Sequence, residues 1–256
     1  VLGLPRYGPV LPDNGHEKAG PVNLPAGSFP THICSMTHYD LTIRVAHHPL
    51  LRPGGFTTHF PTPLGKLSSP PWLTDLLALH AQAPVQRDET LRLAVRDMLR
   101  HWGHKAAGRG KPASEYLIRA VDRGELGSIN AAVDVCNAIS LHSGFPIALV
   151  DLDRAHPPFQ VAPGTPEESY VFNASGQEMS LKGLICLRDA DGPCANPVKD
   201  AQRTKTHEGT TRTLTVMWGV AGFENRRDDA LAWYAELLGD LGASVKWAEV
   251  VMDPPA

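Results

Sequence analysis

The chain has 256 residues, enough to bury one large hydrophobic core or two modest ones. Its formal net charge of −3, from 24 basic and 27 acidic residues, excludes a chain that is polycationic throughout but not a local basic face. The four cysteines form no CxxC pair, so a zinc ribbon or a disulfide scaffold is not expected, and a reducing, cytoplasmic location is favoured. No apolar run is long enough to cross a membrane.

The N-terminal part of the chain divides in two by composition. Residues 1–35 are rich in Pro and Gly without a hydrophobic period, which predicts an extended arm. Residues 36–105 are expected to form a mostly helical extension packed on the rest of the chain. In this extension, alternating side chains predict a strand from Tyr39 to Val45, and the stretch from Ala46 to Ser69 is expected to be a loop. Two helices are predicted to follow, over Pro71–Ala81 and Asp88–His101.

Three histidines in the predicted loop, His47, His48 and His59, raise the question of a metal site. No cysteine or carboxylate stands at ligand spacing beside them, and the pair His101 and His104 needs two further ligands. Solvated histidines are the better interpretation, so neither a metal nor another cofactor is expected.

Basic residues line one face of the second predicted helix and continue into the Gly-rich loop after it. The six are Arg92, Arg96, Arg100, Lys105, Arg109 and Lys111. The three arginines recur every four residues and therefore share a helix face. Such a stripe suits the phosphate backbone of RNA. The alternative is an ordinary solvated helix face.

The stretch from Ser128 to Arg154 carries the strongest pattern in the chain. A helix beginning near Asn130 places Asn130, Asp134 and Asn137 on one face, Gly144 is placed to end it, and an apolar strand then leads to Asp151. A polar stripe on a helix packed against a strand is either a buried hydrogen-bond network or the floor of a site.

The rest of the chain is mostly β, which predicts an α+β fold with β-sheets packed against helices. Strands are expected over Phe159–Ala162, Ser169–Asn173, Gly183–Arg188, Thr213–Gly219 and Ser244–Met252. An amphipathic helix is predicted over residues 228–241, and Ser114 is expected to cap an earlier helix.

A second polar segment, from Asn196 to Thr210, falls between two predicted strands. Its lysines, arginine and hydroxyls suit a phosphate, a ribose or an aminoacyl group. The alternative is a surface hairpin of mixed charge. The functional interpretation requires residues 130–137 and 199–206 to line one cavity, with Asn137 and Arg203 on the same side of the molecule.

Both polar segments resemble a known family. The first follows, in order and spacing, the signature of the B3/B4 domain of the bacterial phenylalanyl-tRNA synthetase β subunit and its freestanding relatives. The matching residues are Ser128–Asn130, Val133–Val135, Asn137, Gly144, Pro146 and Asp151. Gly108–Glu115 and the Lys-Asp-x-x-Arg-Thr-Lys pattern from Lys199 are typical of the freestanding group. The resemblance, from about Arg109 to Trp218, implies a B3/B4-like domain over residues 106–256.

In the synthetase this domain hydrolyses wrongly charged aminoacyl-tRNA, so the resemblance implies a trans-editing aminoacyl-tRNA deacylase. The substrate-binding residues that it implies are Asn130, Asp134, Asn137, Ala148, Asp151, Asp200, Gln202, Arg203, Thr204 and Lys205. Gln202 stands near the place of a glutamate that recognises tyrosine in the family, and Ala148 replaces a histidine, which argues against tyrosine editing. If Asp200 faces the pocket, a cationic, arginine-like side chain is expected.

The expected reaction is hydrolysis of the ester that joins an amino acid to the terminal ribose of tRNA. The ester is labile, so a site can act by holding a water and stabilising the oxyanion, and no Ser-His-Asp set is recognisable. Asp134 is the candidate base, but hydrogen bonding to backbone groups that hold the pocket is its favoured role, and Cys136 is a disfavoured nucleophile. The expected partner is aminoacylated tRNA, with neither DNA nor a membrane.

Two other functions are compatible with the same residues. One is a non-catalytic RNA or amino-acid binding module, and the other is an acyl-ester hydrolase of small-molecule metabolism. The sequence does not identify the tRNA, the amino acid or the oligomeric state.

Overall fold

The computed structural model describes residues 41–255, and the arm predicted over residues 1–35 lies outside them. Eight strands of this part of the chain form one mixed sheet. In spatial order they are β3 (Ile147–Asp151), β9 (Arg212–Met217), β2 (Gly54–His59), β10 (Ser244–Met252), β1 (Leu41–Val45), β4 (Phe159–Pro163), β7 (Ile185–Asp189) and β8 (Gly192–Ala195). Strand β1 runs parallel to β10 and β4, whereas the other neighbours are antiparallel. A separate hairpin joins β5 (Ser169–Val171) to β6 (Glu178–Ser180).

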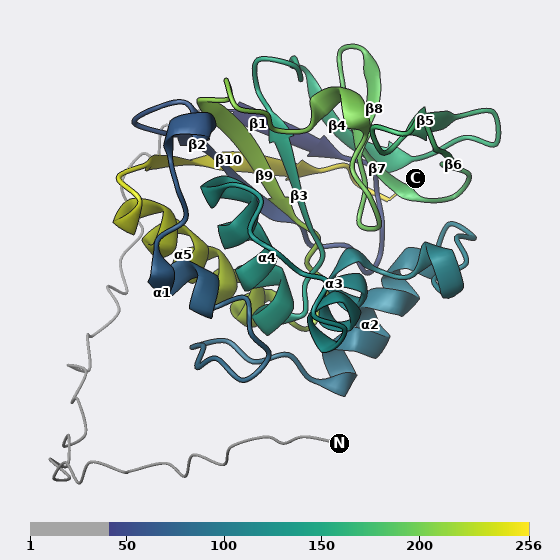
Figure 1. The fold of residues 1–256 in the computed structure, drawn as a ribbon. Coiled ribbons are helices and arrows are strands. Elements are labelled where there is room, and N and C mark those ends of the chain that lie inside the picture. The colour runs from purple at the N-terminus through teal and green to yellow at the C-terminus, as the bar shows by residue number, and fades with distance from the viewer. Residues whose placement is uncertain (1–40, 256) are drawn as a thin grey trace, which may run out of the picture. The chain divides into compact units, whose positions relative to one another are not determined.

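The helices gather on one side of this sheet (Figure 1). They are α1 (Pro71–Asp75), α2 (Glu89–Arg100), α3 (Ala113–Asp122), α4 (Ala131–Ser143) and α5 (Glu224–Asp240). Helix α4 packs against α1, α3, α5 and strand β3, so it is the centre of the helical layer. None of the helices in the described part of the chain is long and apolar enough to cross a membrane.

Helix α4 has the boundaries that its sequence predicts. The Val133 N–H donates to Oδ1 of Asn130 at 3.0 Å, which satisfies one of the free amides of the first turn. At the other end Gly144 has φ of 85°, a conformation that favours glycine and ends the helix. The following chain then enters β3, in which all five residues are buried.

The core lies between the sheet and the helices. Its largest fully buried side chains include Phe56 on β2 and Tyr234 on α5, whose rings meet edge to face with centroids 5.1 Å apart. Each such side chain contributes roughly 1.5–3 kcal/mol through burial, which holds the helical layer on the sheet.

The expected α+β fold is confirmed, but the loop prediction for Ala46 to Ser69 is wrong where β2 forms. The four inner residues of β2 are buried, so the strand lacks the alternation of polar and apolar residues that marks a half-exposed strand. A Cβ added at Gly55 would lie 2.3 Å from the Thr215 carbonyl oxygen, so glycine permits the close pairing with β9.

Three helix boundaries also differ from the predictions. Helix α1 ends at Asp75, several residues early, and α5 begins at Glu224, before the predicted residue 228. Pro112, and not Ser114, occupies the N-cap of α3; Ser114 is buried inside the helix. The predicted domain boundary near residue 105 remains a prediction. The segment before it supplies β1 and β2 to the same sheet that β9 and β10 complete.

Candidate functional site

The two polar segments line one cavity, as the functional interpretation of the sequence required. This cavity, called cavity 1, has a volume of about 540 Å³. Its lining comes from α3, α4, β3 and the loops around residues 172 and 200. The 128–137 part contributes Ile129, Asn130, Val133, Cys136 and Asn137, and the later segment contributes Val198, Lys199, Asp200, Lys205 and Thr206. Most other lining residues are apolar, so the few polar groups dominate its recognition chemistry.

Asp200 is the most unusual polar group in cavity 1. Its Oδ2 accepts a hydrogen bond from the Leu149 N–H at 3.2 Å. Its Oδ1 is buried and has no hydrogen-bond partner among the described residues. Burial raises the pKa of Asp200 from 3.8 to about 7, against the opposing effects of the Leu149 amide and Lys205. A hydrogen-bond donor or cation supplied by a ligand would satisfy Oδ1 and stabilise the carboxylate.

Lysines and aromatic rings form another part of the wall of cavity 1. The Lys199 ammonium lies 3.7 Å from the centre of the Phe172 ring and 5.9 Å from that of Tyr116. Lys205 Nζ donates to the Phe172 carbonyl oxygen at 2.6 Å. The sequence interpretation missed Tyr116 and Phe172, because isolated aromatic residues are ordinarily predicted to be core.

Asn130 and Asn137 line cavity 1, but Asp134 does not. Asp134 is fully buried and accepts hydrogen bonds from the hydroxyls of Ser69 and Ser128 and from the Ile129 N–H at 2.9 Å. The expectation that all three polar residues of α4 face one site is therefore wrong. The geometry favours the alternative of backbone hydrogen bonding over a catalytic base, because the Asp134 oxygens already have partners.

Asp151 is also fully buried and holds a loop in place. The hydroxyl of Thr210 donates to its Oδ2 at 2.6 Å, and His207 Nε2 lies 3.2 Å from the same oxygen. The other ring nitrogen of His207 accepts from the Gly209 N–H at 3.1 Å. Both ring nitrogens are thus engaged, which leaves His207 without a free lone pair for general-base catalysis.

A second cavity, called cavity 2, adjoins the first and has a volume of about 670 Å³. Its walls are residues 64–69, 128–130 and 206–208. Ile129, Asn130 and Thr206 line both cavities. At this shared edge the side-chain amide of Asn130 donates to Thr206 Oγ1 at 3.4 Å.

The site geometry can now be compared with known proteins. Residues 105–229 match the family model described as the B3/4 domain. The chain contains a B3/4 domain. This match covers α3, α4, β3 and the 199–206 segment, so it includes the whole lining of cavity 1. A comparison with curated protein sequences gave no significant match.

The solved structures that are similar to the chain include two with low sequence identity. One is an N-terminal fragment of the phenylalanyl-tRNA synthetase β-subunit from Pyrococcus horikoshii, with 12% identity and a TM-score of 0.49 over 84% of this chain and 52% of that one. The chain therefore spans about half of the length of that fragment. The other is the TILS C-terminal domain, with 15% identity and a TM-score of 0.27 over 30% of this chain and 72% of that one.

Besides Asp134 and Asp151, four more of the predicted substrate-binding residues lie outside cavity 1. Ala148 is fully buried on β3 between Ile147 and Leu149, which line the cavity, so its side chain points to the opposite face of the sheet. The Thr204 hydroxyl donates to the Cys194 carbonyl oxygen at 2.9 Å. Gln202 does not line the cavity.

Arg203, the fourth, is paired with a buried carboxylate. Its guanidinium donates to both oxygens of Asp189, at 2.9 and 2.6 Å, and to the Gly192 carbonyl oxygen at 2.9 Å. Although burial alone would raise the pKa of Asp189, the hydrogen bonds and charge of Arg203 lower it. Arg203 therefore anchors the loop instead of binding a ligand in cavity 1. The two segments that contain Asn137 and Arg203 line the same cavity, but of these two side chains only that of Asn137 does so.

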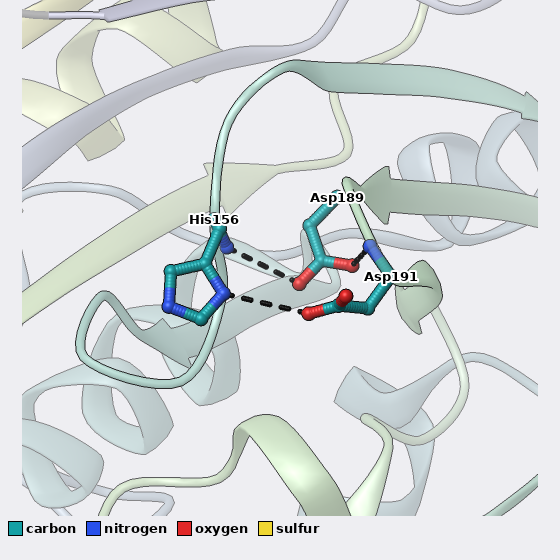
Figure 2. Close-up of side chains that lie close together, drawn as sticks. All are labelled: His156, Asp189 and Asp191. Carbon is teal, nitrogen blue, oxygen red and sulfur yellow. Dashed lines mark hydrogen bonds and ion pairs between the residues drawn. The ribbon is translucent and has the colours of Figure 1, made fainter.

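Next to this pair, His156, Asp189 and Asp191 are close enough to hold a metal ion (Figure 2). However, the oxygens of Asp189 already accept hydrogen bonds from Arg203 and from the His156 and Asp191 amides. A metal would have to displace Arg203. The cluster fits a network of ion pairs and hydrogen bonds around Asp189 better than a metal centre, and the absence of a cofactor remains a prediction.

The predicted basic stripe is largely neutralised by acidic neighbours. Glu115 of α3 accepts a bidentate hydrogen bond from Arg96 at 2.6 and 2.5 Å, and Glu89 pairs with Arg92. Arg100 pairs with Asp97 at 2.7 Å. The acidic residues that precede and follow the stripe in the chain were not weighed in the sequence interpretation.

The three basic residues of the loop after the stripe differ in exposure. Lys111 is only 2% exposed and lies 4.2 Å from the Tyr116 ring centre, and burial lowers its pKa. It is therefore not placed to contact a phosphate backbone, contrary to the prediction. Lys105 and Arg109 are exposed, and neither has an ion pair among the described residues. They are the strongest remaining candidates for RNA contacts on this side.

The cysteines of the described part of the chain are free and buried. Cys136 lines cavity 1, but burial and the neighbouring Asp200 raise the pKa of its thiol to about 12. A thiol with this pKa is almost entirely protonated at neutral pH, so it does not supply the thiolate that nucleophilic catalysis needs.

Proposed function

We propose that this B3/4 domain protein hydrolyses the ester bond of a mischarged aminoacyl-tRNA. The observation that carries the proposal is cavity 1, a largely apolar space closed by both polar segments of the family signature with Asp200 at its wall. The family resemblance supplies the reaction class, and the cavity is large enough to hold an amino-acid side chain.

The side chain that fits cavity 1 best is cationic. Asp200 Oδ1 is buried without a partner among the described residues, and a guanidinium or ammonium group would supply both the missing donor and the countercharge. An apolar side chain would leave that oxygen unpaired, at a cost of about 1–3 kcal/mol. Asp200 would thus discriminate between amino acids by charge.

The reaction needs few protein groups. A water molecule attacks the ester carbonyl carbon, the bond from this carbon to the ribose oxygen breaks, and the ribose oxygen takes up a proton. The products are the free amino acid and tRNA with a free terminal hydroxyl. Asp134, His207 and Cys136 are unsuited to act as base or nucleophile, so the site would act by positioning the labile ester, with assistance from the vicinal ribose hydroxyl.

The test is a deacylation screen with tRNAs charged with proteinogenic and analogue amino acids. We expect faster release of at least one amino acid than spontaneous hydrolysis gives, with cationic side chains preferred. Asp200→Asn should lower kcat/KM for the cationic substrate by roughly 10–100-fold, the loss expected of a charge-assisted hydrogen bond. Asp153→Asn, an exposed substitution, is the matched control.

Three other outcomes separate the alternatives. If no charged tRNA is hydrolysed but tRNA still binds, the protein is a binding module and the proposed reaction is wrong. Equal kcat/KM for an amino-acid ethyl ester and the corresponding aminoacyl-tRNA would indicate a small-molecule esterase. If Asp200→Asn leaves the preference for cationic side chains unchanged, the assignment of specificity to Asp200 is wrong even where hydrolysis is observed.

A further inference from the structure

A third cavity, called cavity 3, lies where strand β2 ends and strands β9 and β10 begin. Its volume is about 270 Å³. These three strands are neighbours in the sheet (Figure 1). The residues that line cavity 3 are Thr57, Thr58, His59, Arg212, Ser244 and Lys246. None of the six is acidic, and none of them lines cavity 1 or cavity 2, so the proposed reaction does not use this part of the molecule.

The strand register places the basic side chains of cavity 3 on one face of the sheet. His59 is paired with Arg212 of β9 on one side and with Ser244 of β10 on the other. Lys246 is two residues beyond Ser244 on β10, so both side chains project from the same face. Directly paired residues have Cβ atoms about 4.5–5.5 Å apart, so the side chains of Arg212, His59 and Ser244 are close enough to bind one ligand.

Two of the basic side chains of cavity 3 have no counter-charge in the described part of the chain. Arg212 and His59 are exposed, and neither forms an ion pair with another described residue. Arg212 carries its charge at every physiological pH, and His59 adds a second charge when it is protonated. Like charges on directly paired residues repel each other, and an anion bound between them removes this repulsion.

The groups around cavity 3 are hydrogen-bond donors that suit a phosphate. The Arg212 guanidinium presents its N–H groups in a planar fork that matches two phosphate oxygens. The His59 ring supplies at least one N–H in either protonation state, and Ser244 supplies a hydroxyl. Donors from three strands suit the several oxygens of a phosphate group better than the two oxygens of a carboxylate.

The backbone that carries these donors is held firmly. The Phe60 N–H donates to the Thr211 carbonyl oxygen at 2.8 Å, which continues the pairing of β2 with β9 beyond His59. Phe60 is also buried, so its ring anchors the end of β2 in the core. Binding groups on paired strands are positioned more precisely than groups on loops, which reduces the entropy lost when a ligand binds.

We propose that cavity 3 binds a phosphate group, with Arg212 and His59 as its principal contacts and Ser244 as a further donor. The phosphate is either a free ion or part of an RNA backbone, and each source has its own test. The inference goes beyond the proposed function, because it requires neither hydrolysis nor a ligand in cavity 1.

The test for free phosphate is thermal unfolding at rising concentrations of inorganic phosphate, with sodium chloride holding the ionic strength constant. A ligand that binds only the folded state raises Tm with its concentration. Phosphate also stabilises proteins by exclusion from their surface, so the measured quantity is the difference between wild type and each variant. Arg212→Ala should weaken phosphate binding by roughly 10-fold, because a charge-assisted hydrogen bond is lost, and Arg212→Lys should restore part of the affinity.

Lys182→Ala is the control, because it removes an exposed cation that lines none of the three cavities. Its response to phosphate should equal that of wild type. Heteronuclear NMR locates the site independently: phosphate should shift the backbone amide signals of His59, Arg212 and Ser244 in wild type, and shift them much less in Arg212→Ala.

Filter binding of a short single-stranded RNA tests the other source. If the phosphate belongs to RNA, Arg212→Ala should lower the affinity a few-fold and reduce the slope of log affinity against log salt by about 1, whereas Lys182→Ala should change neither. A response to RNA without one to inorganic phosphate assigns the site to the RNA backbone. If Arg212→Ala matches wild type in both experiments, the proposed site is wrong. Neither experiment depends on deacylation, so the inference and the proposed function can fail separately. Circular dichroism confirms that each variant is folded.

Discussion

Asp134 and Asp200 have carboxylate oxygens that are buried, but only Asp200 lines cavity 1, and the hydrogen bonding of the two groups differs. Asp134 accepts hydrogen bonds from two hydroxyls and a backbone amide, whereas Asp200 has one oxygen without a partner among the described residues. A satisfied buried carboxylate stabilises the fold, and an unsatisfied one costs stability unless a ligand completes it. The difference indicates which carboxylate is structural and which is available for recognition.

The largest effect is expected from Asp134→Ala. The substitution leaves Ser69, Ser128 and the Ile129 amide without their acceptor, so the free energy of unfolding should fall by about 3 kcal/mol. Urea denaturation measures this loss, with exposed Asp153→Ala as the control, for which a change within about 0.5 kcal/mol is expected. A similarly small loss for Asp134→Ala would contradict the structural role of this carboxylate.

Arg203→Ala tests Asp189, a second buried carboxylate whose oxygens have hydrogen-bond partners. Asp189 would lose its bidentate partner, and the free energy of unfolding at pH 7 should fall by about 2 kcal/mol, a value reduced for the partial exposure of Arg203. Because Arg203 lowers the pKa of Asp189 in the folded state, its contribution is present above the ordinary Asp pKa of 3.8 and is lost as pH falls below it.

The measurement is urea denaturation of wild type and Arg203→Ala at several pH values between 3 and 7. Exposed Arg119→Ala is the matched control. If the difference in the free energy of unfolding between the two proteins were the same at every pH, the Arg203–Asp189 ion pair would not be the source of that difference.

Asp200→Asn is expected to raise the free energy of unfolding, in contrast to the two substitutions above. The folded-state pKa of about 7 lies above the ordinary value of 3.8, so wild type loses stability as pH rises from about 4 through 7, and the loss is complete just above pH 7. The amide variant should lack this loss and be more stable than wild type at pH 8, by on the order of 2 kcal/mol, with little difference at pH 4. Urea denaturation at the two pH values tests this, and a variant less stable than wild type at pH 8 would show that Asp200 is satisfied without a ligand.

The smallest effect concerns RNA affinity. Arg109 is exposed without an ion pair among the described residues, whereas Arg100 is paired with Asp97. Arg109→Ala should therefore weaken tRNA binding a few-fold and reduce the slope of log affinity against log salt by about 1, and Arg100→Ala should change both less. Filter binding between low and moderate salt measures these quantities. If Arg100→Ala lost more tRNA affinity than Arg109→Ala, the result would indicate that RNA contacts the exposed face of helix α2.

Local sequence determined much of the fold. The Asn130 cap, the Gly144 ending and the apolar strand after it are specified by neighbouring residues, so helix α4 and strand β3 form where the sequence predicts them. The family match over residues 105–229 includes this helix and strand. Strand β2 was missed because a strand buried on both faces has no alternation, and its burial depends on strands far away in the chain.

The sequence alone determined that two polar segments and a B3/4 signature exist in this chain, because helical spacing and turn residues act over a few positions. Only the tertiary structure decided which of the polar side chains are free to act. Asp134 is hydrogen-bonded by Ser69, Arg96 is paired with Glu115, and Arg203 is paired with Asp189. Each of these partners comes from a different segment of the chain. In the described part of the chain, no such partner reaches Oδ1 of Asp200. The physical reason is that hydrogen bonding and burial depend on distance in space, which side-chain spacing along the chain does not specify.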